Sequence, residues 1–309
     1  MTKTTTTIPI RGIELLYGLR DSERYIYHYT SAITFLDKIA PTNTIRLSPY
    51  TKTNDPKESK QWQFSASIRD STKYSFEDWP SDKLCSKMNE GLKHHTNVAC
   101  FSCDGELTGD HLVDIYNRGW CKPRMWSQYG DEHKGVCLVF QRDKLEAAFR
   151  AAFPTARPWA VGRVSYCNRP VLLRRDDPTY FIIIDELAKR GWEEYIRNHL
   201  QQYHKRLFFE KNADWSAENE YRFVVWGGTG SSEFINFDDS LRGVMFGASA
   251  SDETIRAVYS AVRDRGVFTQ QLRWQGCAPW YNLEKSFEWE IRYREEMRAN
   301  ASRTGRATL

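Results

Sequence analysis

Alternation of apolar and polar residues first defines a compact segment near the start of the chain. Aromatic and β-branched residues fill 25–29 and predict a short strand. Ser31 follows as an N-cap residue, and apolar residues at helical spacing then predict a helix that Pro41 ends. Residues 44–48 predict a second strand before Pro49 begins a polar loop. The segment is therefore expected to fold as strand, helix, strand and loop.

The rest of the chain alternates between strand-like and helix-like patterns. Apolar runs predict further strands near residues 97–102, 135–140, 161–166, 220–226, 233–237, 241–247 and 268–274. Helical spacing of apolar residues predicts helices near residues 56–69, 81–95, 143–153, 180–209 and 251–265. Gly191 is expected to kink or split the fourth helix. This mixture predicts an α+β fold with helices packed outside a split, mixed sheet.

Composition supports a folded protein of 309 residues. Hydrophobic residues make up 40% and aromatic residues 14%, which is far above what a disordered chain carries. We expect a flexible leader at 1–20, a single domain at 21–285 and a basic tail at 286–309. The net charge of +4 permits binding to RNA or DNA without requiring it, and some of the eleven Trp could stack on planar ligands.

The sequence predicts a cytoplasmic protein. No apolar run approaches the roughly 20 residues that cross a bilayer, and the first residues lack a signal-peptide pattern, so no membrane contact is expected. Seven cysteines, an odd and scattered set, are expected to be reduced. Cys100 and Cys103 have zinc-like spacing, but no second matching pair follows, so no metal site is expected.

Three segments carry candidate chemistry. His28 lies at the end of the first predicted strand beside a helix N-terminus, where imidazole and free N–H groups suit phosphates or ribose hydroxyls. The ordinary alternative is a partly buried histidine among packing tyrosines. Trp126 and Tyr129 share a helix face and could form a wall for a flat ring, or could simply anchor that helix.

The third segment is acidic. If the chain is extended from Glu218 onward, then Glu218, Glu220 and Arg222 point to one face. An exposed strand face would explain them without function. Two neighbouring carboxylates repel, however, and one pKa rises unless Arg222 or a ligand offsets the charge, a tension that is common at functional sites. The glycines at 227–230 match neither a phosphate-binding loop nor a dinucleotide fingerprint.

Taken in order, the motifs resemble those of a large bacterial family that is related to the ADP-ribosyltransferases and occurs in toxin and anti-phage systems. The motifs are Tyr27-His28-Tyr29-Thr30, Arg46-Leu47-Ser48, Asn54-Asp55-Pro56 with Glu58, Cys100-Phe101-Ser102, Met125-Trp126 with Tyr129 and Lys134-Gly135, and Trp215 with Glu218-Asn219-Glu220-Tyr221-Arg222. The resemblance covers residues 24 to about 275. It implies an ADP-ribosyltransferase-like split mixed β-sheet with surrounding helices.

The resemblance also implies roles for residues. NAD would be the co-substrate, with no metal. His28 would hold its ribose, an aromatic or hydroxyl residue (Tyr29, Ser48 or Tyr129) would lie against nicotinamide, and Glu220 would stabilise the sugar cation. Glu218 takes the place of Glu220 if the motif is shifted along the strand. The full NAD-binding set would be His28, Tyr29, Thr30, Arg46, Ser48, Asn54, Trp126 and Tyr129.

The function that the resemblance implies is an ADP-ribosyltransferase toxin, part of an anti-phage toxin–antitoxin system, that modifies a nucleic acid, with RNA favoured. Its partners would be that nucleic acid and an antitoxin protein. An NAD glycohydrolase would use the same pocket with water as acceptor. A non-catalytic nucleotide-binding interaction module would bind without turnover, so labelled NAD distinguishes the three.

Overall fold

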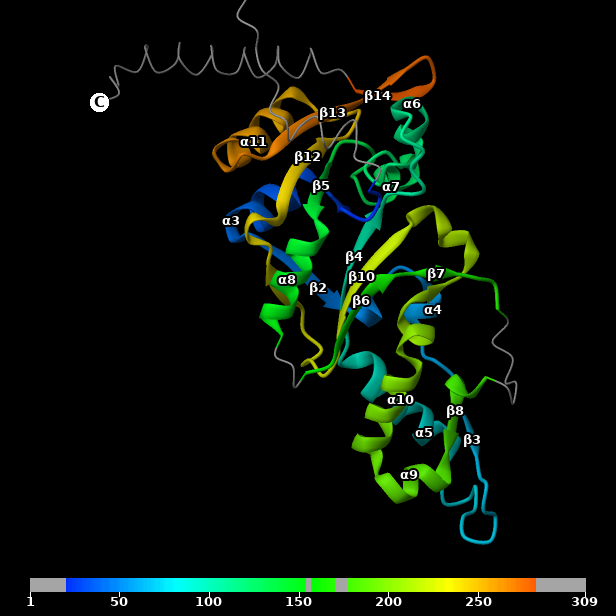
Figure 1. Ribbon diagram of the computed structural model, residues 1–309. Helices are drawn as coiled ribbons and strands as arrows, with labels where there is room; N and C mark the ends of the chain where they lie inside the picture. Colours follow the sequence, from blue (N-terminus) through cyan, green and yellow to red (C-terminus); the bar gives the residue numbers. More distant parts are fainter. Residues whose placement is uncertain (1–20, 154–156, 170–176, 282–309) are drawn as a thin grey trace, which may run out of the picture. The chain divides into compact units, whose positions relative to one another are not determined.

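The computed structural model of the chain describes residues 21–153, 157–169 and 177–281 (Figure 1). The contacts divide the chain into two compact units. The first unit takes its residues from 1–44, 101–147 and 237–309, and the second from 45–100 and 148–236. The predicted leader at 1–20 and basic tail at 286–309 lie outside the described residues.

A mixed sheet forms the centre of the first unit. Strand β1 (Tyr25–Thr30) pairs antiparallel with β5 (Val136–Gln141) along its whole length. On the far side of β5, β12 (Leu241–Phe246) is antiparallel to it and parallel to β13 (Phe268–Gln275). The sheet is completed by β14 (Ala278–Tyr281), antiparallel to β13, and by the end of β4 (Asn97–Cys103), antiparallel to β1.

Helices of the first unit connect these strands. After β1, Ser31 caps the helix by accepting a hydrogen bond from the Thr34 backbone N–H at 3.1 Å. The helix continues past Pro41, where the sequence predicted its end, and stops at Asn43, whose φ is 55°. The turns of this segment are α2 (Ala32–Thr34), the π-helical η2 (Phe35–Ile39) and α3 (Ala40–Thr42).

A strand–helix–strand connection joins the parallel pair β12 and β13. Its helix, α11 (Asp252–Val262), is capped by Ser251 and buries Ile255, Val258 and Val262 at helical spacing. The remaining helical segments are α6 (His111–Asp114), η5 (Ile115–Asn117), α7 (Pro123–Gln128), η8 (Asp238–Ser240) and η9 (Arg263–Arg265). Helix α8 (Arg142–Ala152) has residues in both units.

Strand β10 (Glu220–Val225) is central to the second unit, and all six of its residues are buried. It pairs antiparallel with β6 (Trp159–Arg163) and also pairs with β4. Strand β2 (Thr44–Pro49) is antiparallel to β4, and β11 (Glu233–Asn236) pairs with β2. A strand that is buried on both faces must satisfy any charged side chain internally.

Short parallel pairs replace two parts of the predicted helices. Strand β3 (Ser65–Ser67) pairs with β8 (Phe181–Ile183). The predicted helices at 56–69 and 180–209 are therefore wrong in these parts, because pairing between distant segments overrides local helical spacing. A second such pair joins β7 (Ser165–Tyr166) with β9 (Glu210–Lys211).

The other predicted helices of the second unit form, but the helix predicted at 56–69 is limited to residues 56–59. Gly191, with φ 77°, separates α9 (Ile184–Arg190) from α10 (Trp192–Phe208), as its position in the pattern predicted. The other helical segments are η3 (Tyr50–Lys52), α4 (Pro56–Ser59), α5 (Ser81–Asn89), η4 (Glu90–His94), η6 (Pro178–Tyr180) and η7 (Ala213–Glu218).

The protein is thus an α+β protein with a mixed sheet and helices, as the sequence predicted. Each unit has its own apolar cluster: Tyr27, Tyr29 and Trp126 belong to that of the first, and Tyr50 and Phe208 to that of the second. Among the described residues, none of the helices combines the length and apolar character needed to cross a membrane.

Candidate functional site

The acidic motif lies where a turn becomes a strand. Glu218 ends the 3-10 helix η7, Asn219 takes a left-handed conformation with φ 43°, and Glu220 begins β10. Glu220 and Arg222 share one face of the strand, as the alternation predicted, whereas Glu218 precedes the strand instead of belonging to it. All three side chains are buried, with 3%, 4% and 0% exposed for Glu218, Glu220 and Arg222. The alternative of an exposed strand face is therefore wrong.

Arg222 is the centre of the hydrogen bonds in this cluster. Its Nε donates to Glu220 Oε1 at 2.5 Å, and its Nη2 donates to Glu220 Oε2 at 3.0 Å. Nη2 also pairs with Glu58 of α4, and Nη1 donates to the Phe208 carbonyl at 2.6 Å. Every nitrogen of the guanidinium thus has an acceptor, which a fully buried cation requires.

Lys211 of β9 joins the two carboxylates of the acidic motif. Its Nζ lies 2.8 Å from Glu218 Oε2 and 2.9 Å from Glu220 Oε2. The same ammonium lies 5.0 Å from the centre of the Trp215 ring, over its face. Together, Glu58, Lys211, Glu218, Glu220 and Arg222 form a buried charge network, and we use that name for these five residues.

The charges of the network shift its pKa values in opposite directions. Burial raises the pKa of Glu220, but Arg222 and Lys211 outweigh burial and lower it to about 2, so Glu220 is anionic at neutral pH. Burial raises the pKa of Glu58, and Arg222 offsets this only in part. The network has three carboxyl groups and two cations, and Glu58 is the carboxyl group whose pKa is raised. Within the described residues, its Oε2 has no hydrogen-bond partner.

Neutral groups enclose the network. The Cys100 thiol is hydrogen-bonded to Glu220, and burial next to this carboxylate raises the thiol pKa far above its usual value, so it stays protonated. The Tyr166 hydroxyl accepts a hydrogen bond from the Glu220 backbone N–H at 2.8 Å. Tyr50 and Trp62 lie against Phe208 with ring centres 4.9 and 5.5 Å away. This environment excludes water and strengthens electrostatic interactions inside it.

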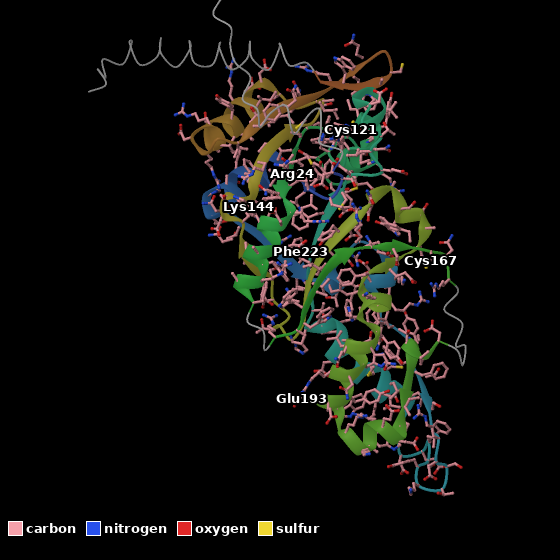
Figure 2. The ribbon with its side chains drawn as sticks, viewed as in Figure 1. Arg24, Cys121, Lys144, Cys167, Glu193 and Phe223 are labelled. Carbon is pink, nitrogen blue, oxygen red and sulfur yellow. The ribbon has the colours of Figure 1, made fainter. Side chains whose placement is uncertain are left out.

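Phe223, labelled in Figure 2, shows how the opposite face of β10 is used. Its ring lies 5.1 Å from Phe149 and 5.8 Å from Tyr221, measured between centres. One face of the strand is therefore ordinary apolar core, and the other carries the buried charge network.

Other predicted residues of the second unit lie on β2 and just before α4. Arg46 is exposed and Ser48 half-buried on β2, and Asn54 is exposed beside Asp55. Asp55 caps α4 by accepting from the Lys57 N–H at 2.9 Å, so the Asn54-Asp55-Pro56 motif begins the helix that carries Glu58. The motif therefore has a structural role in positioning Glu58.

The predicted residues of the first unit gather around Tyr29. Its hydroxyl donates to the Gly119 carbonyl at 2.6 Å, and its ring meets Trp126 edge-on at 4.9 Å. Tyr129 packs partly buried against the same cluster. Packing accounts for the positions of Tyr29 and Trp126. The role of both residues in binding NAD stays a prediction.

His28 and Thr30 are neighbours of Tyr29 on β1. His28 is half-buried, with its ring 5.5 Å from that of Phe101, and Thr30 is buried. By alternation, both side chains point to the face of the strand opposite that of Tyr29. His28 belongs to the first unit and Glu220 to the second. Their assignment to one NAD site stays a prediction.

Sequence reasoning missed Lys211 and gave Glu58 no role. Lys211 is the only basic residue between Arg206 and Arg222, a stretch with four acidic residues, and this imbalance could have indicated an internal ion pair. Glu58 lies far from β10 in sequence, so no local pattern links it to Arg222. Within the described residues, no group of three or more His, Cys, Asp or Glu side chains is arranged to hold a metal ion.

Comparison with known protein families finds a match to part of the chain. A family model described as a protein of unknown function (DUF2971) matches residues 125–223. The matched stretch begins at Met125 of α7 and ends in β10, so it contains Lys211, Glu218, Glu220 and Arg222 but not Glu58. No curated protein matches the chain, and no solved structure does.

Proposed function

We propose that this protein is an NAD-dependent ADP-ribosyltransferase with an ADP-ribosyltransferase-like split sheet, and that Glu220 is its key acid. The observation that supports this most is the ionisation of Glu220: Arg222 and Lys211 keep its carboxylate anionic inside a dry environment. Breaking the bond between nicotinamide and ribose sends the electron pair to nicotinamide and leaves positive charge on the sugar. A fixed carboxylate about 3 Å away stabilises that charge.

The ion pairs of Glu220 indicate which of them a bound substrate would replace. Lys211 can leave Glu220 and stay paired with Glu218 at 2.8 Å, while Glu220 stays paired with Arg222. Neither ion is then left alone, so this opening avoids the penalty of an unpaired buried charge. Arg222 has no comparable freedom, because it also binds Glu58 and the Phe208 carbonyl. Glu218 therefore acts as the second site for Lys211, and Glu220 is favoured over Glu218 as the key acid.

The acceptor that we propose is a nucleic acid, with RNA first, and the activity would be that of a toxin held in check by an antitoxin protein. The net charge of +4 and the 14% aromatic content are compatible with such an acceptor. His28 would hold the ribose of NAD, with Tyr29, Thr30, Arg46, Ser48, Asn54, Trp126 and Tyr129 as further contacts.

The test incubates the purified chain with NAD labelled in the ADP-ribose moiety, together with RNA, DNA and protein. Label on RNA, located by mass spectrometry, is the expected result. Release of free ADP-ribose alone would instead identify an NAD glycohydrolase. Binding of NAD without release of nicotinamide would contradict both enzymes and favour a nucleotide-binding interaction module.

Variants at position 220 separate chemistry from folding. Glu220→Gln should lower turnover by a factor on the order of a hundred or more. Glu220→Asp keeps the charge for Arg222 and Lys211 but withdraws the carboxylate by one methylene, so it should stay folded and still lose about a hundredfold. Glu193→Gln, at the exposed start of α10 (Figure 2), is the control and should react like the parent. If Glu220→Asp reacts at the parental rate, Glu220 is not the key acid.

A further inference from the structure

A cavity of about 500 Å³ lies within the second unit, away from the residues of the buried charge network. It is bounded by α9, α10 and β8, and by the chain at Arg69. Its volume is within the range of about 300–1,000 Å³ that small-molecule sites occupy.

One face of α10 lines this cavity with groups that recognise ligands. Tyr195, Asn198, His199, Gln202 and Tyr203 all line it, and their spacing of three and four residues places them on the same side of the helix. An amphipathic helix ordinarily presents Leu, Ile or Val on its inner face. Here the face offers aromatic rings and carboxamides, a combination that can stack on a flat ring and hydrogen-bond to its edge.

His199 gives the cavity a neutral hydrogen-bond acceptor. Burial lowers the pKa of His199 to about 4, so the ring is uncharged at neutral pH. Its Nε2 lies 2.9 Å from the Thr179 carbonyl oxygen, which can only accept, so Nε2 carries the proton. Nδ1 is then an acceptor. The ring lies stacked beside Tyr195, with centres 6.1 Å apart, and 4.7 Å from Tyr203.

Two guanidinium groups stand at the cavity in exchangeable ion pairs. Arg69 pairs with Glu186 at 2.9 Å, and Arg190 pairs with Glu194 at 3.0 Å, with 65% and 41% of the two arginine side chains exposed. Exposed pairs of this kind contribute little, so a phosphate can replace a carboxylate at low cost. Arg69, Arg190 and Glu186 line the cavity, whereas Glu194 pairs with Arg190 from outside the lining.

We propose that this cavity binds a single nucleotide unit. The base would lie against Tyr203 and be read at its edge by His199 and the Asn198 and Gln202 carboxamides. The phosphate would meet Arg190 and Arg69. This site is separate from the one proposed around Glu220, and the inference holds whether or not the protein consumes NAD. The nucleotide unit can come from a free mononucleotide or from a single-stranded nucleic acid.

The test measures binding by isothermal titration calorimetry. The probes are AMP, GMP, CMP and UMP, a short single-stranded RNA, and the fragments adenosine and inorganic phosphate. At least one mononucleotide should bind more tightly than either fragment. Tighter binding of the RNA than of every mononucleotide identifies single-stranded nucleic acid as the source, and the reverse identifies a free nucleotide.

Variants locate the binding. Arg190→Gln should weaken nucleotide binding about tenfold and leave adenosine binding unchanged, since the lost contact is to phosphate. Tyr203→Leu should weaken nucleotide and adenosine alike. Arg197→Gln is the matched control, because Arg197 forms the same type of pair along α10, with Glu193 at 3.2 Å, but does not line the cavity. Equal effects of Arg190→Gln and Arg197→Gln, or the absence of nucleotide binding by the parent chain, would overturn the proposal.

Discussion

Replacing Glu58 and Glu220 with glutamine, singly and together, tests how charge is balanced in the buried charge network. Glu58, Glu218 and Glu220 supply three carboxyl groups, and Lys211 and Arg222 supply two cations, with every side chain at most 4% exposed. We expect Glu58 to be the neutral member. Glutamine at position 58 then resembles the neutral carboxyl group of Glu58, whereas glutamine at position 220 removes the carboxylate that pairs with Arg222 and Lys211.

The magnitudes follow from the pKa values. Lowering the pKa of Glu220 from 4.5 to about 2 corresponds to about 3 kcal/mol of folding free energy at neutral pH. Glu220→Gln should cost about that amount, similar to the roughly 3–5 kcal/mol for breaking a buried ion pair. Glu58→Gln should cost at most about 1 kcal/mol, since neutral hydrogen bonds of this kind contribute that much.

The double variant carries the sharper prediction. When Glu220 is replaced, Glu58 can release its proton and become the anion that Arg222 needs, so part of the loss is recovered. With both replaced, Arg222 faces no carboxylate, and the cost should exceed the sum of the single costs by about 1–3 kcal/mol.

Urea unfolding at pH 7, followed by tryptophan fluorescence, measures these free energies by linear extrapolation. The exposed Glu193→Gln is the control and should stay within about 0.5 kcal/mol of the parent. Two results would refute the reasoning. One is additivity of the two substitutions within about 0.5 kcal/mol. The other is a Glu58→Gln variant as unstable as Glu220→Gln.

Three further predictions concern other sites. Because the pKa of folded His199 is lowered from 6.5 to about 4, the unfolded chain takes up the proton first, so stability should fall by about 3 kcal/mol as pH drops from about 6.5 to about 4. Urea unfolding across this range should show a smaller fall for His199→Gln. Gly119→Ala would place a Cβ 2.2 Å from the Tyr27 ring and 2.8 Å from the Cys103 carbonyl carbon, and should lower the thermal midpoint with a loss of about 1–3 kcal/mol. Tyr29→Phe leaves the buried Gly119 carbonyl without its hydroxyl donor and should cost about 1–3 kcal/mol by urea unfolding; an unchanged midpoint would contradict this.

Most strands could be predicted because their apolar runs are local properties of the sequence. The strands β1, β5 and β12 lie within one or two residues of their predicted positions. Residues 65–67 and 181–183 were predicted as helical from the local spacing of their apolar residues. In the structure they pair as parallel strands although they lie more than a hundred positions apart, and local spacing carries no information about such a pairing. Strands whose pairing partners are distant in the sequence therefore cannot be predicted from the periodicity of apolar residues alone.

The candidate site was predicted only in part. Alternation correctly placed Glu220 and Arg222 on one face of β10. The sequence predicted that either Arg222 or a ligand would offset the charge of the carboxylates, and Arg222 does pair with Glu220. The burial of that face was not predicted, because three charged side chains in five residues indicate solvent unless their partners are known. Those partners, Glu58 and Lys211, come from α4 and β9, which only the folded chain brings to β10.

The left-handed backbone of Asn219 restricts how relatives of this chain can be recognised. Glycine, asparagine and aspartate adopt φ near 43° most readily, and Asn219 joins η7 to β10 between two acids whose carboxylates both reach the Lys211 ammonium. A search pattern for this arrangement should therefore admit these three residues between the glutamates and reject β-branched ones. Chains that carry valine or isoleucine at this position would match the Glu-x-Glu sequence pattern but would not adopt its backbone geometry.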